Sequence, residues 1–117
     1  MMDLNDYAKE CHVANLKWWQ DPKTGQLIER NFGELIALMH SELSEALEGH
    51  RKGLNDDKLP HRLMVEVELV DCLIRIFDTS NALGFDLEGA YQEKMAYNAQ
   101  RADHKHENRL LAGGKKY

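Results

Sequence analysis

The stretch that decides the fold is LMVEVELVDCLIRIF, residues 63–77, in which eleven of fifteen residues are apolar. It shows no alternation of apolar and polar residues, and Pro60 and Gly84 flank it. Since proline is tolerated at the start of a helix and glycine is common just after its end, we expect one helix over residues 61–83. A helix that is apolar on nearly every side is normally buried, so this one is expected to be buried almost all round.

Three charged residues interrupt this apolar stretch on one side. Glu68, Asp71 and Arg75 fall within an arc of about 60° at 100° per residue, while Glu66 points the opposite way. Burying an unpaired carboxylate costs several kcal/mol, so these acids must face partners, water or a metal. An internal salt bridge with Arg75 is one interpretation. It does not explain why two acids stand at an i,i+3 spacing.

The rest of the chain favours three further helices. Asn31 with Glu34 three residues later is typical of a helix N-terminus, and Asp86 is a second capping residue. The segment 21–25 is a turn by composition. No strand alternation or repeat is present, so the expected fold is an all-α four-helix bundle in one domain, residues 1–102, with a polar tail at 103–117. The other three helices are expected at residues 3–19, 31 to 49 or 53, and 86 to 101 or 102.

Composition narrows the class of protein. The 117 residues are 43% hydrophobic and 30% charged, the balance of one ordinary globular domain. The sequence contains no run of 18 apolar residues, so no membrane span is predicted. The polar start MMDLNDYAKE does not resemble a secretory signal. Cys11 and Cys72 form no CxxC pair, and we expect a reducing cytoplasm.

The charge balance argues against nucleic acid as a partner. The formal net charge is −5, from 20 acidic and 15 basic residues. The basic residues gather only at Lys105 with Arg109 and at Lys115 with Lys116, which are typical of a solvated tail. A polyanionic ligand would therefore need something other than bulk charge, and a divalent metal is the obvious means.

A second pair of acids, Glu42 and Glu45, has the same i,i+3 spacing on the helix that begins near Asn31. Alone, the pair is compatible with an ordinary solvated face. Together with Glu68 and Asp71 on an antiparallel helix, however, it can bring four carboxylates to one point. Oxygen ligands of this kind select Mg²⁺ or Mn²⁺.

The last predicted helix shows polar residues where apolar ones are expected. Leu87 and Tyr91 begin an inward seam, and its continuation falls on Lys94, Asn98 and Arg101. One interpretation is that the helix end leaves the core and is solvated. The other is a row of hydrogen-bond donors directed at phosphate oxygens, because Arg and Lys are the usual phosphate ligands.

The ordered set over residues 33–102 resembles the MazG-like all-α nucleoside triphosphate pyrophosphatases, in which an ExxE pair is followed by an ExxD pair and a downstream Lys/Asn/Arg helix. The resemblance implies hydrolysis of a nucleotide to its monophosphate and pyrophosphate, for clearing the nucleotide pool, by a homodimer or homotetramer. It implies that the four acids bind Mg²⁺ (or Mn²⁺) and that Lys94 and Arg101 bind the phosphates. We hypothesise in addition that Glu42 or Glu45 acts as the general base. The matching residues are Glu42-x-x-Glu45, Glu68-x-x-Asp71 and Lys94-x-x-x-Asn98-x-x-Arg101.

The aromatic residues near the first turn are candidates for contacting a base. Trp18 and Trp19 fall where the resemblance places aromatic residues, and stacking on a ring is worth about 1–3 kcal/mol per base. Adjacent helical residues point about 100° apart, so at most one should face the nucleotide. His12, Asn15 and Tyr97 are further candidates. The alternative is that one tryptophan is core and the other an oligomer contact.

Two other classes compete with this interpretation. A di-iron carboxylate bundle carries Glu-x-x-His on two helices, and no glutamate in this chain has histidine at that position. A non-catalytic helical adaptor or oligomerisation module remains the alternative. It would account for the helices but not for the acid pairs.

Overall fold

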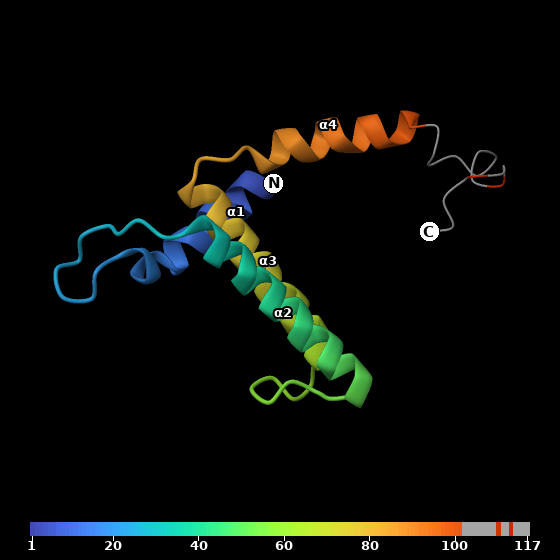
Figure 1. Cartoon of the computed structure of the whole chain (residues 1–117), viewed down its shortest axis with the longest axis horizontal. Coiled ribbons are helices and arrows are strands. Elements are labelled where there is room, and N and C mark those ends of the chain that lie inside the picture. The colour runs from blue at the N-terminus through green and yellow to red at the C-terminus, as the bar shows by residue number, and fades with distance from the viewer. Residues whose placement is uncertain (102–109, 111–112, 114–117) are drawn as a thin grey trace. The chain divides into compact units, whose positions relative to one another are not determined.

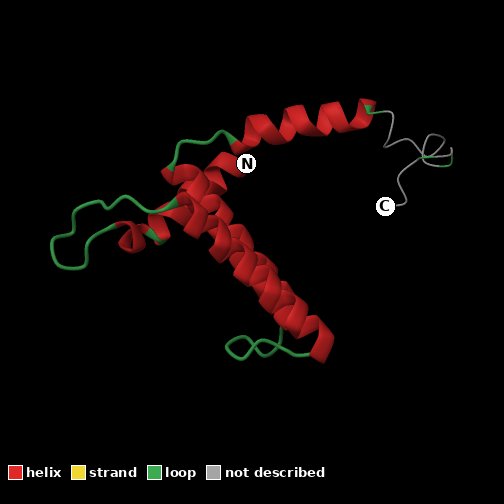
Figure 2. Ribbon diagram, in the orientation of Figure 1, coloured by secondary structure: helices red, strands yellow, loops and turns green. Residues whose placement is uncertain are grey.

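The computed structural model describes residues 1–101, Leu110 and Gly113, and this part of the chain is all-α (Figures 1 and 2). It has no β-strand, only two isolated bridges in the loops. The chain divides into two compact units, Met1–Phe85 and Asp86–Tyr117, each described by itself. The single domain over residues 1–102 therefore stays a prediction, and most of the predicted tail at 103–117 lies outside the described residues. The elements are α1 (Leu4–Ala14), the 3₁₀ turn η1 (Leu16–Trp19), α2 (Phe32–Lys52), α3 (Met64–Ala82) and α4 (Leu87–Gln100).

The predicted helix ends are confirmed at most caps. The Asn31 side chain accepts a hydrogen bond from the Glu34 backbone N–H at 3.0 Å, and α2 ends at Gly53 in the left-handed region, with φ of 62°. A residue without a Cβ adopts that conformation at little cost. The Asp86 carboxylate likewise accepts from the Gly89 N–H at 2.9 Å and starts α4.

Two predicted boundaries are wrong. The first helix is not continuous over residues 3–19, because it stops at Ala14, where the Asn15 side chain donates to the Cys11 carbonyl at 2.8 Å. A short 3₁₀ turn then carries the chain to Trp19. The third helix begins three residues later than expected, at Met64, because the Leu59 carbonyl accepts from the Arg62 N–H in a tight turn before it.

The Met1–Phe85 unit is built on α3, with α2 along one side of it and α1 packed against its C-terminal part (Figure 1). Gly49 permits the close approach of α2 to α3, since a Cβ there would come within 2.8 Å of the Met64 side chain. At the other end, the rings of Tyr7 and Phe77 stack with centroids 5.9 Å apart. The close approach at Gly49 therefore places α2 and α3, the two helices that carry the acid pairs, directly side by side.

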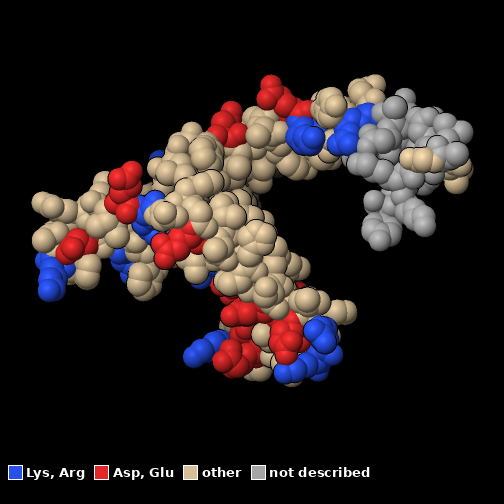
Figure 3. Space-filling view, in the orientation of Figure 1, with Lys and Arg blue, Asp and Glu red and all other residues tan. Residues whose placement is uncertain are grey.

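The hydrophobic core of the described residues is small. Helix α3 is not buried all round in the single chain, because Leu69, Val70 and Leu73 remain about half exposed. Leu43 and Leu47 of α2 are 46% and 57% exposed. Figure 3 shows a broad uncharged surface over these helices, with acidic side chains gathered toward the end of the α2–α3 hairpin. The buried apolar residues are Ala8, Trp19, Leu35, Ala46 and Cys72.

Among the described helices, none is both long enough and apolar enough to cross a membrane.

Candidate metal centre and neighbouring pocket

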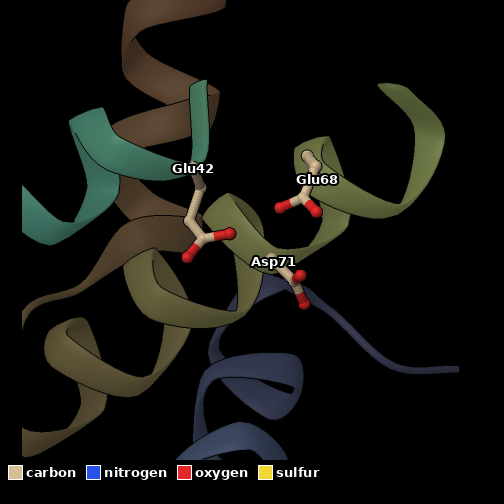
Figure 4. Close-up of side chains that lie close together, drawn as sticks. All are labelled: Glu42, Glu68 and Asp71. Atoms are coloured by element: carbon tan, nitrogen blue, oxygen red, sulfur yellow. The ribbon is translucent and has the colours of Figure 1, made fainter. Parts of the chain in front are cut away.

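Three of the four predicted acids converge between α2 and α3. Glu42 reaches across from α2, and Glu68 and Asp71 face it from successive turns of α3 (Figure 4). One carboxylate oxygen from each lies within 4.8 Å of the others. The i,i+3 spacing of the α3 pair produces this convergence, because both side chains leave the helix on the side that packs against α2.

The cluster is held away from water. Glu42 and Glu68 are each 8% exposed, and Asp71 is half-buried. Within the described part of the chain, the buried Oε2 of Glu68 has no hydrogen-bond partner. Burial raises the pKa of Glu68 to about 8, and the nearby carboxyls of Glu42 and Glu45 raise it in the same direction. Such an oxygen needs a proton or a cation to be stable where it lies.

Among the described residues, Arg75 forms a salt bridge across to α2 and not with Glu68 or Asp71, the acids of its own helix considered from the sequence. Its Nε lies 3.2 Å from Glu42 Oε1, and its side chain is 39% exposed. The pKa of Asp71 is still raised, by burial and by the charge of Glu42, although Arg75 acts in the opposite direction. The Arg75 guanidinium therefore offsets the charge of Asp71 only in part and forms no ion pair with Glu68 among the described residues, so the salt bridge alone does not account for the cluster.

Glu45, the fourth predicted ligand, lies at the edge of the site. It is exposed and does not belong to the group of three converging oxygens. It is nevertheless close enough to Glu68 to contribute to the raised pKa of that carboxyl. It therefore lies at the exposed edge of the acid cluster and not within it.

Asp56 is an additional carboxylate that sequence reasoning missed. It lies in the loop between α2 and α3, is 7% exposed, and its Oδ2 accepts from the backbone N–H groups of Lys58 and Leu59. Its charge also raises the pKa of Asp71. The run Asn55-Asp56-Asp57 has the composition of an ordinary turn, so nothing in the sequence separated this acid from its neighbours.

A second cluster of polar side chains lies further along α3, where Asp78 contacts His12 of α1 and Trp19 of η1. The Trp19 indole Nε1 donates to both Asp78 oxygens, at 3.0 and 3.1 Å, and His12 Nδ1 lies 2.8 Å from Asp78 Oδ1. Asp78 is 8% exposed. Sequence reasoning missed this residue, because its two partners are 59 and 66 positions away.

The two partners of Asp78, His12 and Trp19, border a cavity of about 500 Å³. Trp19 is 7% exposed, and the Arg30 guanidinium lies over its ring at 4.9 Å from the centroid. The cavity is large enough for a small planar ligand. It is lined by His12, Trp19, Leu27, Ile28, Glu29, Arg30, Phe32, Ala82 and Leu83.

The structure separates the two tryptophans, as their adjacent positions predicted. Trp19 lines the cavity, whereas Trp18 is 59% exposed and has Lys17 Nζ over its ring at 5.0 Å. The Asn15 side chain is engaged with the Cys11 carbonyl at the end of α1. Of these candidates for a base contact, Trp19 and His12 are the two that reach the cavity.

The predicted phosphate ligands lie together along the C-terminal half of α4 and at its C-cap, Arg101. Lys94 Nζ and Arg101 Cζ lie 5.0 and 5.8 Å from the centroid of the Tyr97 ring. Asn98 is half-buried, and its Oδ1 has no hydrogen-bond partner among the described residues. These four residues belong to the second unit, which is described by itself, so their role toward the acid cluster stays a prediction.

Comparison with known proteins adds nothing to this geometry: no family model matches the chain, and no curated protein or solved structure shows significant similarity to it.

Proposed function

We propose that this chain is a Mg²⁺-dependent nucleoside triphosphate pyrophosphohydrolase with a MazG-like organisation, converting a nucleotide to its monophosphate and pyrophosphate in clearance of the nucleotide pool. The observation that carries the proposal is the buried Glu68 carboxyl, which has an oxygen without a hydrogen-bond partner among the described residues and lies against Glu42 and Asp71. An isolated salt bridge or a solvated acidic face would not leave that oxygen buried and unpaired.

The donor set fits a hard divalent cation. Glu42, Glu68 and Asp71 would hold it, because carboxylate oxygens within 4.8 Å of one another suit Mg²⁺ or Mn²⁺ better than softer metals. When bound, such a cation polarises phosphate oxygens and makes an attacking water more acidic. Glu45 remains available at the exposed rim of the site. We assign it the role of general base that takes the proton from that water.

Other residues of the chain would orient the substrate. Arg75 fixes the Glu42 carboxylate through the 3.2 Å contact, which leaves the other oxygen of Glu42 for the cation. Lys94 and Arg101 would bind the phosphates that leave as pyrophosphate, with Asn98 and Tyr97 beside them. Their charges favour the pyrophosphate leaving group, because hydrogen bonds from cations to phosphate are about twice as strong as neutral ones.

The cavity at Trp19 is the proposed position of the base. Asp71 and Asp78 lie seven residues apart on α3, which is two turns and about 10 Å along the helix, on the same face. A base in the cavity and phosphates at the acid cluster would therefore lie on one side of α3. Trp18, which points away from the cavity, is not needed in this arrangement.

We further propose that a second copy of the chain covers the exposed apolar face of α2 and α3. Five buried apolar residues make a small core for the part of the chain that the structure describes, while large apolar side chains of both helices remain exposed. A homodimer would bury this face. The exposed members of this face are Leu43, Leu47, Leu69, Val70 and Leu73.

A non-catalytic oligomerisation module would also need a covered apolar face, so that surface does not separate the two functions. The acid cluster does separate them. Burying Glu42, Glu68 and Asp71 costs stability, and an adaptor has no compensating use for a divalent cation at that place.

The test is a pyrophosphate-release screen over ribo- and deoxynucleoside triphosphates, common and damaged, with and without Mg²⁺. We expect Mg²⁺-dependent release with at least one substrate, and its loss in Glu42→Gln and Asp71→Asn. Glu48→Gln is the matched control, because Glu48 lies on the same helix but pairs with Lys52 on the surface. Folded protein that releases no pyrophosphate from any member of the panel contradicts the proposal.

A further inference from the structure

At the cavity beside Trp19, the contacts of Asp78 determine which nitrogen of the His12 ring carries the hydrogen. Asp78 is buried and contacts both Trp19 and His12. The Trp19 indole can only donate, so the Asp78 carboxylate is an acceptor on that side. An ionised carboxylate has no proton to give, and the 2.8 Å contact with His12 therefore requires the hydrogen on His12 Nδ1.

This arrangement leaves one nitrogen of the His12 ring for a ligand. In a neutral imidazole whose Nδ1 carries the hydrogen, Nε2 is a hydrogen-bond acceptor. His12 lines the cavity and its side chain is 20% exposed. The ring is also held in orientation by Trp19, against which it packs edge-on with centroids 5.6 Å apart.

The other side chains around the cavity add an aromatic wall and further polar groups. Trp19 lines the cavity, and its Nε1 is already committed to Asp78. Glu29, an acidic residue, lines the same cavity. Arg30 is a donor, and it lies over the face of Trp19. A flat ring that carries an amino group would match this set.

We infer that Asp78 is a specificity-determining residue: by holding the hydrogen on His12 Nδ1, it makes the cavity select heteroaromatic rings with an exocyclic amino group over rings with a carbonyl at the same position. Cytosine and adenine are rings of the first kind, and uracil and hypoxanthine are their matched counterparts of the second. The identification of the ring as a nucleobase rests on the proposed function. Asp78 acts through His12 and is a positioning residue, not a catalytic one.

The experiment measures nucleoside binding without phosphates or metal, so that it is independent of hydrolysis. Trp18→Phe leaves Trp19 as the single tryptophan, and its fluorescence reports occupancy of the cavity. In EDTA at about pH 8.5, where imidazole is ordinarily neutral, we expect cytidine to bind more tightly than uridine and adenosine more tightly than inosine. One hydrogen bond gained or lost corresponds to a difference of roughly threefold to tenfold in each pair.

Asp78→Asn, made in the Trp18→Phe variant, tests whether Asp78 determines the position of the His12 hydrogen. The asparagine amide oxygen can accept from Trp19 while its nitrogen donates to His12 Nδ1, which moves the ring hydrogen to Nε2. The preference should then reverse toward uridine and inosine. Asp57→Asn, an exposed change in the loop between α2 and α3, is the control that should leave the preference unchanged.

Three results would overturn the inference: equal affinities within each pair, an unaltered preference in folded Asp78→Asn, or no nucleoside binding at all. If Asp78→Asn does not fold, the inference is tested instead by the tautomer of His12 in the unmodified chain. Nitrogen-15 NMR should find the hydrogen on Nδ1, and a hydrogen on Nε2 refutes the inference. Pyrophosphate release is measured separately, so the proposed function can survive each of these failures.

Discussion

The raised pKa of Glu68 makes the stability of the metal-free protein depend on pH in a defined direction. Below the ordinary glutamate pKa of 4.5, Glu68 is protonated in both the folded and the unfolded chain. Between 4.5 and about 8, only the folded chain retains that proton. Stability therefore falls as pH rises through this window, because the unfolded state binds fewer protons there.

The size of the effect follows from the displacement of the pKa. One pH unit of displacement corresponds to about 1.4 kcal/mol. For Glu68 the full window amounts to a loss on the order of 3–5 kcal/mol in the free energy of unfolding. Glu68→Gln removes the ionisation and keeps the shape of the side chain. At about pH 9 without metal, this variant should be more stable than the unmodified protein by a similar amount.

The assay is urea denaturation in EDTA over this pH range, with Glu48→Gln as the control that keeps the unmodified pH dependence. Saturating Mg²⁺ should restore stability to the unmodified protein at the alkaline end, because a ligand that binds only the folded state stabilises it. The reasoning is refuted if Glu68→Gln shows the same loss of stability with pH as the unmodified chain, or if it is the less stable of the two at alkaline pH.

Four further outcomes are expected. Asp71→Asn should abolish hydrolysis while leaving the metal-free fold as stable or more stable in denaturation, because like charges no longer meet; an unfolded variant would instead favour a salt bridge with Arg75. Lys94→Ala and Arg101→Ala should each lower kcat/KM roughly tenfold to a hundredfold, because each loses charge-assisted hydrogen bonds of about 1.5–3 kcal/mol. Mn²⁺ binding should be unchanged, and full turnover by both variants contradicts their assigned role. Reaction in ¹⁸O water should label the nucleoside monophosphate, whereas label in pyrophosphate alone means attack at the β-phosphorus. Light scattering should give at least twice the 13.5 kDa chain mass, and a monomer at working concentration would disprove the covered apolar face.

Local sequence signals predicted the helices and the acid cluster well, because both depend on short spacings. The caps at Asn31, Gly53 and Asp86 are determined by residues within four positions of each other. The convergence of Glu68 and Asp71 follows from an i,i+3 spacing within the largely apolar stretch over residues 63–77. Such features are present in the sequence before any tertiary contact forms.

Features that depend on distant contacts were missed or misjudged. The helical spacing of Leu16 to Trp19 continues that of α1, yet Trp19 donates to Asp78, 59 residues away, from a 3₁₀ turn. Asp78 itself carries no local signal of its partners. Helix α3 was predicted to be buried on all sides because most of its residues are apolar. Composition shows how much apolar surface must be covered, but not whether the same chain covers it.

The most direct test of the metal centre is a crystal structure of the protein grown or soaked with Mn²⁺, located by its anomalous scattering. We predict a single strong peak between Glu42, Glu68 and Asp71, with carboxylate oxygens at about 2.1 Å, the distance expected for a hard divalent cation of this size. The peak should be absent in crystals of Asp71→Asn. Well-ordered carboxylates with no Mn²⁺ between them, in crystals that hold the ion elsewhere or not at all, would contradict the account.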